Sequence, residues 1–208
     1  MATHVQSAER PADSSWKQEL NTLKTPAHKD IASPIEVGSR APSSAKIPLP
    51  DGRSTLIVFL RHCGCPFAEK TFKALTAISA TYPSLHCIAV SHSTKEATER
   101  WIPQVGGAWN VEVLVDDDRD LYAQWGLGVS SIWHMASPWV LYSVYRLGQT
   151  EGIWNKPAES GTRWQISGAF AIDRSGIVRW AHVDKAADDT ARLNDGVIAL
   201  GVEKDAEP

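Results

Sequence analysis

The sequence predicts an α/β sandwich with a mixed central sheet, and three features support that prediction. The apolar run Leu56–Leu60 has the length and β-branched content of a buried strand. Residues 168–173 and 177–181 read as two strands joined by a tight turn, which is an antiparallel hairpin. Between these strands, apolar residues recur at the spacing of one helix face, first at Phe72, Leu75, Ile78 and Tyr82. Strands separated by helices and followed by a hairpin indicate this architecture.

The other elements follow from turn, cap and periodicity signals. Pro50-Asp51-Gly52 is a turn signal, so residues 47–49 are expected to form a short strand before the core strand. Ser93 and Glu96 have the spacing of a capping box, which predicts a helix running to about residue 102. Further strands are expected at 85–91 and 111–115, and further helices at 16–23, 66–82, 121–126, 138–145 and about 188–200.

The length of 208 residues fits one domain preceded by an arm. Residues 1–35 are polar and broken by prolines, so we expect a mobile or loosely docked N-terminal arm. Residues 36–208 then form the domain. An insertion at about 128–164 is too long and too aromatic for a plain connector, and we expect it to determine specificity.

Composition excludes several classes of function. A net charge of −3 and a pI near 6.2 give no electrostatic case for nucleic acid or an anionic membrane. No segment offers 18 consecutive apolar residues, and three closely placed cysteines do not make a disulfide scaffold. We therefore expect a cytoplasmic protein with reactive thiols. The acidic run at residues 116–118 is interpreted as a solvated strand end, so no metal site is predicted.

The turn between the core strand and the helix that follows it contains the candidate reactive thiol. Pro66 suits the first position of a helix, which makes Cys65 the expected N-cap. Its sulfur would then face free backbone N–H groups and the positive end of the helix dipole, with Arg61 and His62 a few residues away. These influences favour the thiolate, which is the nucleophilic form of cysteine. The alternative is that Cys65 and Cys63 are small core residues.

The ordered series VGSRAP, IPLPDGR, LIVFLRHCGCPF and AFAIDRSGIVRW resembles the thioredoxin-like fold, and within it the peroxiredoxin-like group of alkyl hydroperoxide reductase and thiol-specific antioxidant proteins. The resemblance covers about residues 37–181. It implies a thioredoxin-like three-layer sandwich with a central mixed sheet and, here, a Trp-rich insertion. It also implies that Cys65 occupies the position of the peroxidatic cysteine and that no cofactor is bound.

The chain departs from that family at three places around the thiol. Ala68 stands where relatives with a related turn carry a second cysteine, so the usual thioredoxin disulfide cannot form. His62 replaces the Thr or Ser that typical peroxiredoxins place three residues before the cysteine. Ser167 and Gly168 stand where thioredoxins present a proline, which leaves more room above Cys65.

Candidate roles follow for the residues around this turn. Cys63 could resolve a sulfenic acid on Cys65 through a strained bond across Gly64, or an external thiol such as glutathione or thioredoxin could do so. His62 is a candidate base or ion-pair partner for Cys65, with a strand-end histidine bound by backbone as the alternative. Side chains that are candidates to bind substrate, against structural alternatives of surface ion pairing and packing, are Arg61, Arg163, Trp133, His134, Trp164 and Gln165.

Three classes of function remain open. The leading hypothesis is a thiol-dependent oxidoreductase in which Cys65 attacks a peroxide or disulfide, with a small-molecule substrate and an external thiol reductant. The second is an enzyme that has diverged from redox work and acts on a bulky aromatic or lipophilic metabolite in a Trp-lined pocket. The third is a non-catalytic binding module on the same fold. Homodimer formation is left open by the sequence.

Overall fold

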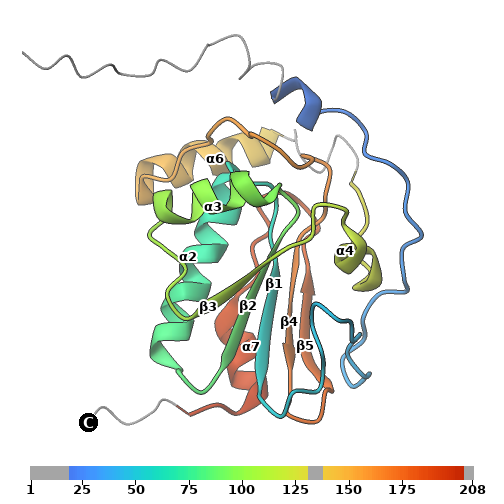
Figure 1. Ribbon diagram of the computed structural model, residues 1–208. Helices are drawn as coiled ribbons and strands as arrows, with labels where there is room; N and C mark the ends of the chain where they lie inside the picture. The colour runs from blue at the N-terminus through green and yellow to red at the C-terminus, as the bar shows by residue number, and fades with distance from the viewer. Residues whose placement is uncertain (1–18, 131–137, 204–208) are drawn as a thin grey trace, which may run out of the picture.

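The structure is a computed structural model that describes residues 19–130 and 138–203. Its centre is a five-stranded mixed sheet in the order β3-β2-β1-β4-β5 (Figure 1). β1 (Thr55–Phe59) pairs in parallel with β2 (His86–Ser91), which pairs in parallel with β3 (Val111–Val115). On its other side β1 pairs antiparallel with β4 (Gly168–Ile172), and β4 with β5 (Val178–Val183). The predicted α/β sandwich and its hairpin are confirmed.

Helices cover both faces of this sheet (Figure 1). One face carries α2 (Pro66–Thr81), α3 (Lys95–Gln104), α6 (Pro138–Glu151) and α7 (Leu193–Leu200), whose buried residues share one hydrophobic cluster. The opposite face carries the short helix α4 (Asp120–Gln124) together with the segment that leads into β1. The result is a three-layer sandwich.

β1 is the centre of the core because it is buried on both faces. Leu56 and Val58 join the cluster on the α2 side, whereas Ile57 and Phe59 pack on the α4 side. All five residues of the strand are buried, which is why the sequence shows an unbroken apolar run rather than an alternating pattern. The Phe59 ring meets three aromatic rings at centroid distances of 5.0 to 6.0 Å, those of Tyr122, Trp125 and Phe170.

Some predicted boundaries are wrong, and side-chain hydrogen bonds explain two of the differences. Residues 47–49 form no strand, because the Ser43 and Ser44 hydroxyls accept hydrogen bonds from the backbone of this segment and fold it as a turn. The cap of α3 is Thr94, not Ser93, and its hydroxyl accepts from the Ala97 amide. α7 begins only at Leu193, whereas α6 extends six residues beyond the predicted end at Tyr145.

Residues 19–35, the part of the predicted arm that the structure describes, lie against the domain. Past a single helical turn the segment runs beside α4 (Figure 1). There the Ala32 amide donates to the carbonyl of Ala123, and the Arg119 guanidinium donates to the carbonyl of Ala27 at 2.8 Å. Lys29 forms an ion pair with Asp120. This segment is therefore part of the second face of the sandwich.

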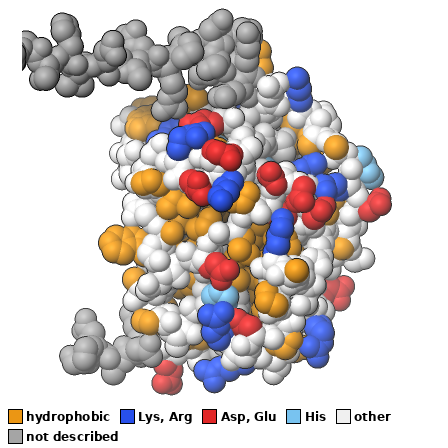
Figure 2. All heavy atoms as spheres, in the orientation of Figure 1, with side chains coloured by type: hydrophobic (Ala, Val, Ile, Leu, Met, Phe, Trp, Pro, Cys, Tyr) orange, Lys and Arg blue, Asp and Glu red, His pale blue; other side chains and the backbone are white. Residues whose placement is uncertain are grey.

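The surface is mixed in charge. Figure 2 shows basic and acidic side chains interspersed on one face rather than gathered into a field of one sign. Among residues 19–130 and 138–203, no three His, Cys, Asp or Glu side chains come together as a group that could hold a metal ion. No helix in the same ranges has the length and apolar character needed to cross a membrane.

Candidate active site

The candidate site is built at the exit of β1, where the chain turns into α2. Cys65 is the N-cap of α2 and Pro66 its first residue, as predicted from the sequence. The Cys65 amide donates to the carbonyl of His62 at 3.0 Å, which closes the turn. Because α2 is sixteen residues long and buried along one side, its position and its dipole at Cys65 are fixed by the core.

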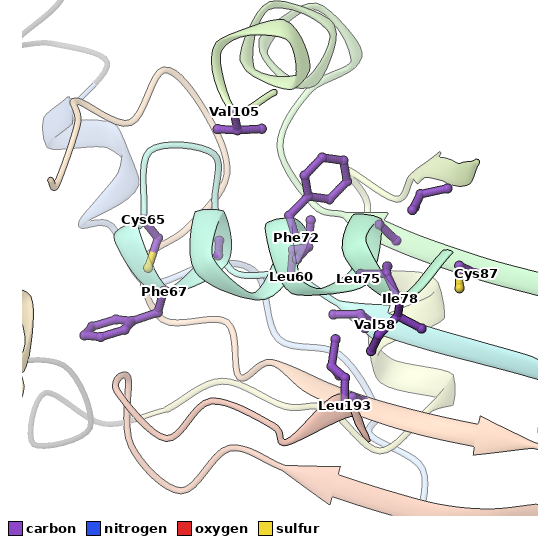
Figure 3. Close-up of a cluster of buried hydrophobic side chains, with 14 of the residues drawn as sticks. Val58, Leu60, Cys65, Phe67, Phe72, Leu75, Ile78, Cys87, Val105 and Leu193 are labelled. Carbon is purple, nitrogen blue, oxygen red and sulfur yellow. The ribbon is translucent and has the colours of Figure 1, made fainter. Parts of the chain in front are cut away.

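Cys65 is 5% exposed and its thiol is free. Figure 3 shows its sulfur at the first turn of α2, on the same side of the helix as the ring of Phe67. Phe67 and Ala68, the second and third residues of α2, line a narrow cavity of about 10 Å³, whereas Cys65 itself is not one of its lining residues. This volume is room for about one water-sized molecule. The absence of a cysteine at Ala68 therefore widens the cavity next to the Cys65 turn.

The other walls of this cavity are the ends of β1, β4 and β5. The whole lining includes five polar residues, which are Arg61, Thr71, Ser167, Asp184 and Thr190. Arg61 is 5% exposed, and its Nη2 donates to the carbonyl of Arg163 at 2.9 Å. Its Nε and Nη1 are buried and have no partner among the described residues. A buried cation with two free donors is suited to bind oxygen atoms of a small polar ligand.

Asp184 is a residue of this site that the sequence reasoning missed. Its carboxylate accepts a hydrogen bond from the Ser167 hydroxyl, and its amide donates to the Ser167 carbonyl at 3.1 Å. Burial raises the pKa of Asp184 from 3.8 to about 6. No signal in the sequence separates this aspartate from an ordinary solvated residue at a strand end.

Cys63 lies in a different environment from Cys65. Its sulfur is 3.7 Å from the Ser91 hydroxyl and 3.8 Å from the Thr98 hydroxyl, and its amide donates to the Ser93 hydroxyl. Burial raises the pKa of the Cys63 thiol, although the three hydroxyl groups partly offset this effect. These contacts hold the Cys63 sulfur toward β2 and α3. Cys87, the third cysteine, is fully buried in the core, as expected.

His62 lies at the turn, but its environment argues against the ion pair with Cys65. The imidazole is 2% exposed and its Nδ1 donates to the Cys63 carbonyl at 3.3 Å. Burial, with a further contribution from the charge of Arg61, lowers the pKa of His62 to about 3. His62 is therefore neutral at physiological pH and bound by backbone. His92, whose Nε2 donates to the Thr162 carbonyl, is buried in the same way, and its pKa is lowered to about 4.

The last part of the Trp-rich insertion closes over the turn. The Lys156 amide donates to the Gly64 carbonyl at 3.0 Å, and the Ser160 hydroxyl accepts from the Thr94 amide. With the bonds of Arg61 and His92 described above, residues 156–163 are bound at two points to the turn and at two points to residues 92–94, which follow β2. We call this segment the covering loop.

Gly64 is required by the covering loop. Its φ is +106°, and a Cβ atom there would lie 2.9 Å from the Lys156 carbonyl oxygen and 3.0 Å from that of Pro157. Gly64→Ala is expected to lower the free energy of unfolding by about 3 kcal/mol, because it adds a backbone clash to the strain of a positive φ. Urea denaturation would measure this loss.

Gly106→Ala is the matched control for this prediction. Its φ is +108°, and nothing lies within 4 Å of the position of an added Cβ. We expect only the conformational strain there, about 1 kcal/mol. Equal losses in the two variants would contradict the role assigned to the covering loop.

Three of the residues predicted to bind substrate are bonded to other parts of the chain. The Arg163 guanidinium pairs with the Glu19 carboxylate, and its Nε donates to the Thr22 hydroxyl at 3.2 Å. The Trp164 indole donates to the Leu23 carbonyl at 2.9 Å. The Gln165 side chain is 1% exposed and donates to the carbonyls of Leu127, Gly128 and Ile166. Their functional groups are therefore occupied by other parts of the chain.

The helical turn at residues 19–24 thus fastens the covering loop. Besides pairing with Arg163, the Glu19 carboxylate accepts from the Ala158 amide at 2.7 Å. Thr22 is 1% exposed, and its carbonyl accepts from the Arg163 amide. We refer to residues 19–24 as the strap. The strap holds the loop, and the loop holds the Cys65 turn.

The described tryptophans of the insertion do not line the cavity beside Arg61, whereas Trp101 lines a second small cavity together with Cys63 and Gly64. Trp133 and His134, two predicted substrate-binding residues, lie outside those residues. Trp154 packs its ring against Gly148 of α6, and Trp139 is 77% exposed. No tryptophan of the described ranges lines the cavity beside Arg61. The small volume of that cavity leaves no room for a bulky aromatic substrate.

Comparison with known proteins decides the family. The sequence profile described as AhpC/TSA antioxidant enzyme matches residues 71–186, just over half of the chain. The chain belongs to the AhpC/TSA antioxidant enzyme family. It is thus a thiol-dependent oxidoreductase of the peroxidase type, as the resemblance implied. The profile match begins six residues after Cys65, so it does not itself assign the nucleophile. A comparison with curated proteins found no match.

Solved structures support the thioredoxin-like fold of this AhpC/TSA protein. A peroxiredoxin-like protein from Aquifex aeolicus aligns with a TM-score of 0.57 at 14% identity, covering 83% of this chain and 91% of that one. A cysteine-to-serine mutant of peroxiredoxin 6 from Arenicola marina gives 0.56 at 12% identity, covering 81% and 72%. Thiol peroxidase from Chromobacterium violaceum gives 0.53 at 15% identity, covering 83% and 91%. At these identities the likeness concerns the fold.

Proposed function

We propose that this AhpC/TSA protein reduces hydrogen peroxide and small hydroperoxides with Cys65 as the nucleophile. The observation that supports the proposal is the position of Cys65 at the start of α2, whose next two turns line a cavity together with Arg61. The buried Arg61 guanidinium has two donors without a partner among the described residues. A thiolate at a helix N-terminus is a good nucleophile, and a fixed guanidinium can bind peroxide oxygens. The small volume of the cavity selects peroxides with a slender head group.

The reaction proceeds in two parts. The Cys65 thiolate attacks the terminal oxygen of ROOH, the O–O bond breaks, and RO⁻ takes up a proton and leaves as ROH. Cys65 becomes a sulfenic acid. An external thiol then forms a mixed disulfide with Cys65 and releases water, and a second external thiol regenerates the Cys65 thiol and leaves as part of a disulfide.

We assign the reaction with the Cys65 sulfenic acid to an external thiol because the Cys63 sulfur is held away from Cys65. Its sulfur is held by Ser91 and Thr98, and burial disfavours its thiolate. The covering loop restricts access to Cys65, so a small reductant such as glutathione fits better than a protein such as thioredoxin. The cytoplasmic location predicted from the sequence agrees with such a reductant and stays a prediction.

A test of the nucleophile combines peroxide kinetics with trapping of sulfenic acid by dimedone. In the wild type we expect one dimedone adduct, located on Cys65 by mass spectrometry. Cys65→Ser is expected to lower the rate of peroxide consumption by at least about 1,000-fold, since it removes the reacting atom. A variant that keeps its full rate would refute the assignment.

Cys63→Ser is the matched control. A serine hydroxyl can replace the thiol within the same hydroxyl cluster, so the fold and the first oxidation step are expected to remain within about threefold of the wild type. Loss of two mass units in the oxidised wild type, with an adduct appearing only in Cys63→Ser, would show an internal disulfide. That outcome would overturn the resolution of the sulfenic acid by an external thiol, and it would leave Cys65 as the nucleophile; an external reductant would still be needed to reduce the disulfide.

The homodimer stays a prediction. The surface on which we expect it is the outer face of α6, where four large apolar side chains are more than half exposed, namely Trp139, Leu141, Tyr142 and Tyr145. Large exposed aromatic groups are typical of interface centres. Sedimentation of the wild type and of Tyr142→Ser would test it, with a lower dimer fraction expected in the variant.

A further inference from the structure

The Asp184 carboxyl is a buried acid that the proposed thiol chemistry does not yet use. It lines the same cavity as Arg61, and its side chain is 9% exposed. It is fixed on both sides: one oxygen accepts from the Ser167 hydroxyl, and the other lies 3.5 Å from Nε2 of His182. A carboxyl that is held this firmly at the wall of a cavity can transfer a proton in a defined direction.

Asp184 is also connected to solvent. His182 is 29% exposed, and its Nε2 lies 3.1 Å from a carboxylate oxygen of Asp189, so it stands between the buried and the outer carboxyl groups. Imidazole exchanges protons with water readily near neutral pH. A series of neighbouring polar side chains therefore leads from the cavity to the surface, in the order Ser167, Asp184 and His182.

The charges around Asp184 decide when it holds a proton. Burial favours the neutral form and is the largest influence on the pKa of about 6, and the charge of Asp189 acts in the same direction. The hydrogen bond from Ser167 and the charges of His182 and Arg61 oppose it. A fraction of the molecules thus carries a protonated Asp184 near neutral pH.

Peroxide cleavage needs such a proton. The attack of Cys65 expels RO⁻ or hydroxide, which are strongly basic leaving groups. Donation of a proton to the departing oxygen by a positioned acid typically accelerates such a step by a factor of roughly 10² to 10⁴. Arg61 can hold the oxygens, but a guanidinium does not give up a proton.

We propose that Asp184 is the general acid of the oxidation step, protonating the oxygen that leaves the peroxide, and that His182 returns the proton from solvent. In this step the bond between Cys65 sulfur and the terminal peroxide oxygen forms and the O–O bond breaks. The proton of Asp184 passes to RO⁻, giving ROH and the Asp184 carboxylate, while sulfur is oxidised and the peroxide reduced. The inference rests on the proposed function.

The test compares two oxidants that differ in their need for a proton. Hydrogen peroxide expels hydroxide, whereas peracetic acid expels acetate, which leaves without protonation. Both rates depend equally on the fraction of Cys65 thiolate, so their ratio isolates the role of the acid. We would measure the ratio of the hydrogen peroxide rate constant to the peracetic acid rate constant from about pH 5 to about pH 7.5. In the wild type we expect this ratio to fall about tenfold per pH unit above about pH 6.

Asp184→Asn keeps the shape of the side chain and its place beside Ser167. At about pH 6 this variant is expected to react with hydrogen peroxide roughly 100-fold more slowly, to react with peracetic acid within about threefold of the wild-type rate, and to show a ratio independent of pH. Asp189→Asn is the control: it removes the outer partner of His182, does not line the cavity, and should leave the ratio within about threefold.

The outcomes separate the two proposals. If neither oxidant modifies Cys65, the proposed function fails. If both oxidants modify Cys65 but the ratio in Asp184→Asn follows that of the wild type, only the role of Asp184 is refuted. The wild-type ratio against pH needs no variant, so a ratio that stays flat across this range would overturn the inference even if Asp184→Asn did not fold.

Discussion

Arg61→Leu is expected to slow the oxidation of Cys65 by hydrogen peroxide by roughly 100-fold, the effect of removing a preorganised donor from developing negative charge. Two of its donors have no partner among the described residues, and both belong to a group that lines the cavity. Stopped-flow kinetics of sulfenic acid formation would measure the change.

The same variant is not expected to lose comparable stability. Within the described part of the chain the Arg61 guanidinium donates to the Arg163 carbonyl alone, and a leucine avoids the burial of an incompletely paired charge. We expect the free energy of unfolding to change by less than about 1 kcal/mol in either direction. A large loss of activity with little change in stability is characteristic of a residue kept for function.

Arg163→Leu is the matched control for Arg61→Leu. Its guanidinium pairs with Glu19 in the strap, so its removal should lower stability while leaving the oxidation rate within about threefold. If Arg163→Leu slowed oxidation as much as Arg61→Leu did, the effect of Arg61 would have to be assigned to the covering loop rather than to peroxide binding.

Acidification is expected to destabilise the protein through two buried histidines. Burial lowers the pKa of His62 to about 3 and that of His92 to about 4, whereas an unfolded histidine titrates near 6.5. Below pH 6.5 the unfolded state therefore binds more protons than the folded state, and the free energy of unfolding falls with pH. When the pH falls from 7 to 5, the two histidines together lower the free energy of unfolding by about 4 kcal/mol.

Asp184 opposes this trend. Its raised pKa means that the folded state binds the extra proton between about pH 4 and pH 6, so its contribution to stability increases as the pH falls. When the pH falls from 7 to 5, the protonation of Asp184 raises the free energy of unfolding by about 1 kcal/mol. Urea denaturation at both pH values should thus show a net loss of about 3 kcal/mol.

His92→Gln and Asp184→Asn separate the two contributions. Gln can still donate to the Thr162 carbonyl, so His92→Gln is expected to reduce the loss between pH 7 and pH 5 by about 2 kcal/mol. Asp184→Asn is expected to enlarge it by about 1 kcal/mol. A free energy of unfolding that does not change between pH 7 and pH 5 would show that the two histidines are not held neutral.

Local sequence signals were sufficient for the elements that position Cys65. The apolar run before Arg61 and the proline after Cys65 predict the strand, the turn and the helix start, because burial and the fixed φ of proline act on neighbouring residues. The strand predicted at residues 47–49 was wrong for a complementary reason. Serine hydroxyls can replace strand hydrogen bonds, and the sequence does not show which bonds form.

The walls of the site could not be predicted in the same way. Arg61 and Arg163 have the same functional group, yet one lines the cavity and the other binds Glu19, which lies more than 140 positions away in the chain. Ser167 and Asp184 meet only because β4 and β5 pair antiparallel. Their roles depend on tertiary contacts, whereas the role of Cys65 depends on its own turn.

The strap places part of the site outside the predicted domain boundary. A version of the protein shortened to residues 36–208 would retain every strand of the sheet, but Arg163 and the Ala158 amide would lose Glu19 as their partner. Such a version is expected to give the same circular dichroism spectrum and a faster reaction of Cys65 with bulky alkylating reagents. Domain trimming by homology would thus yield a well-folded enzyme with altered selectivity.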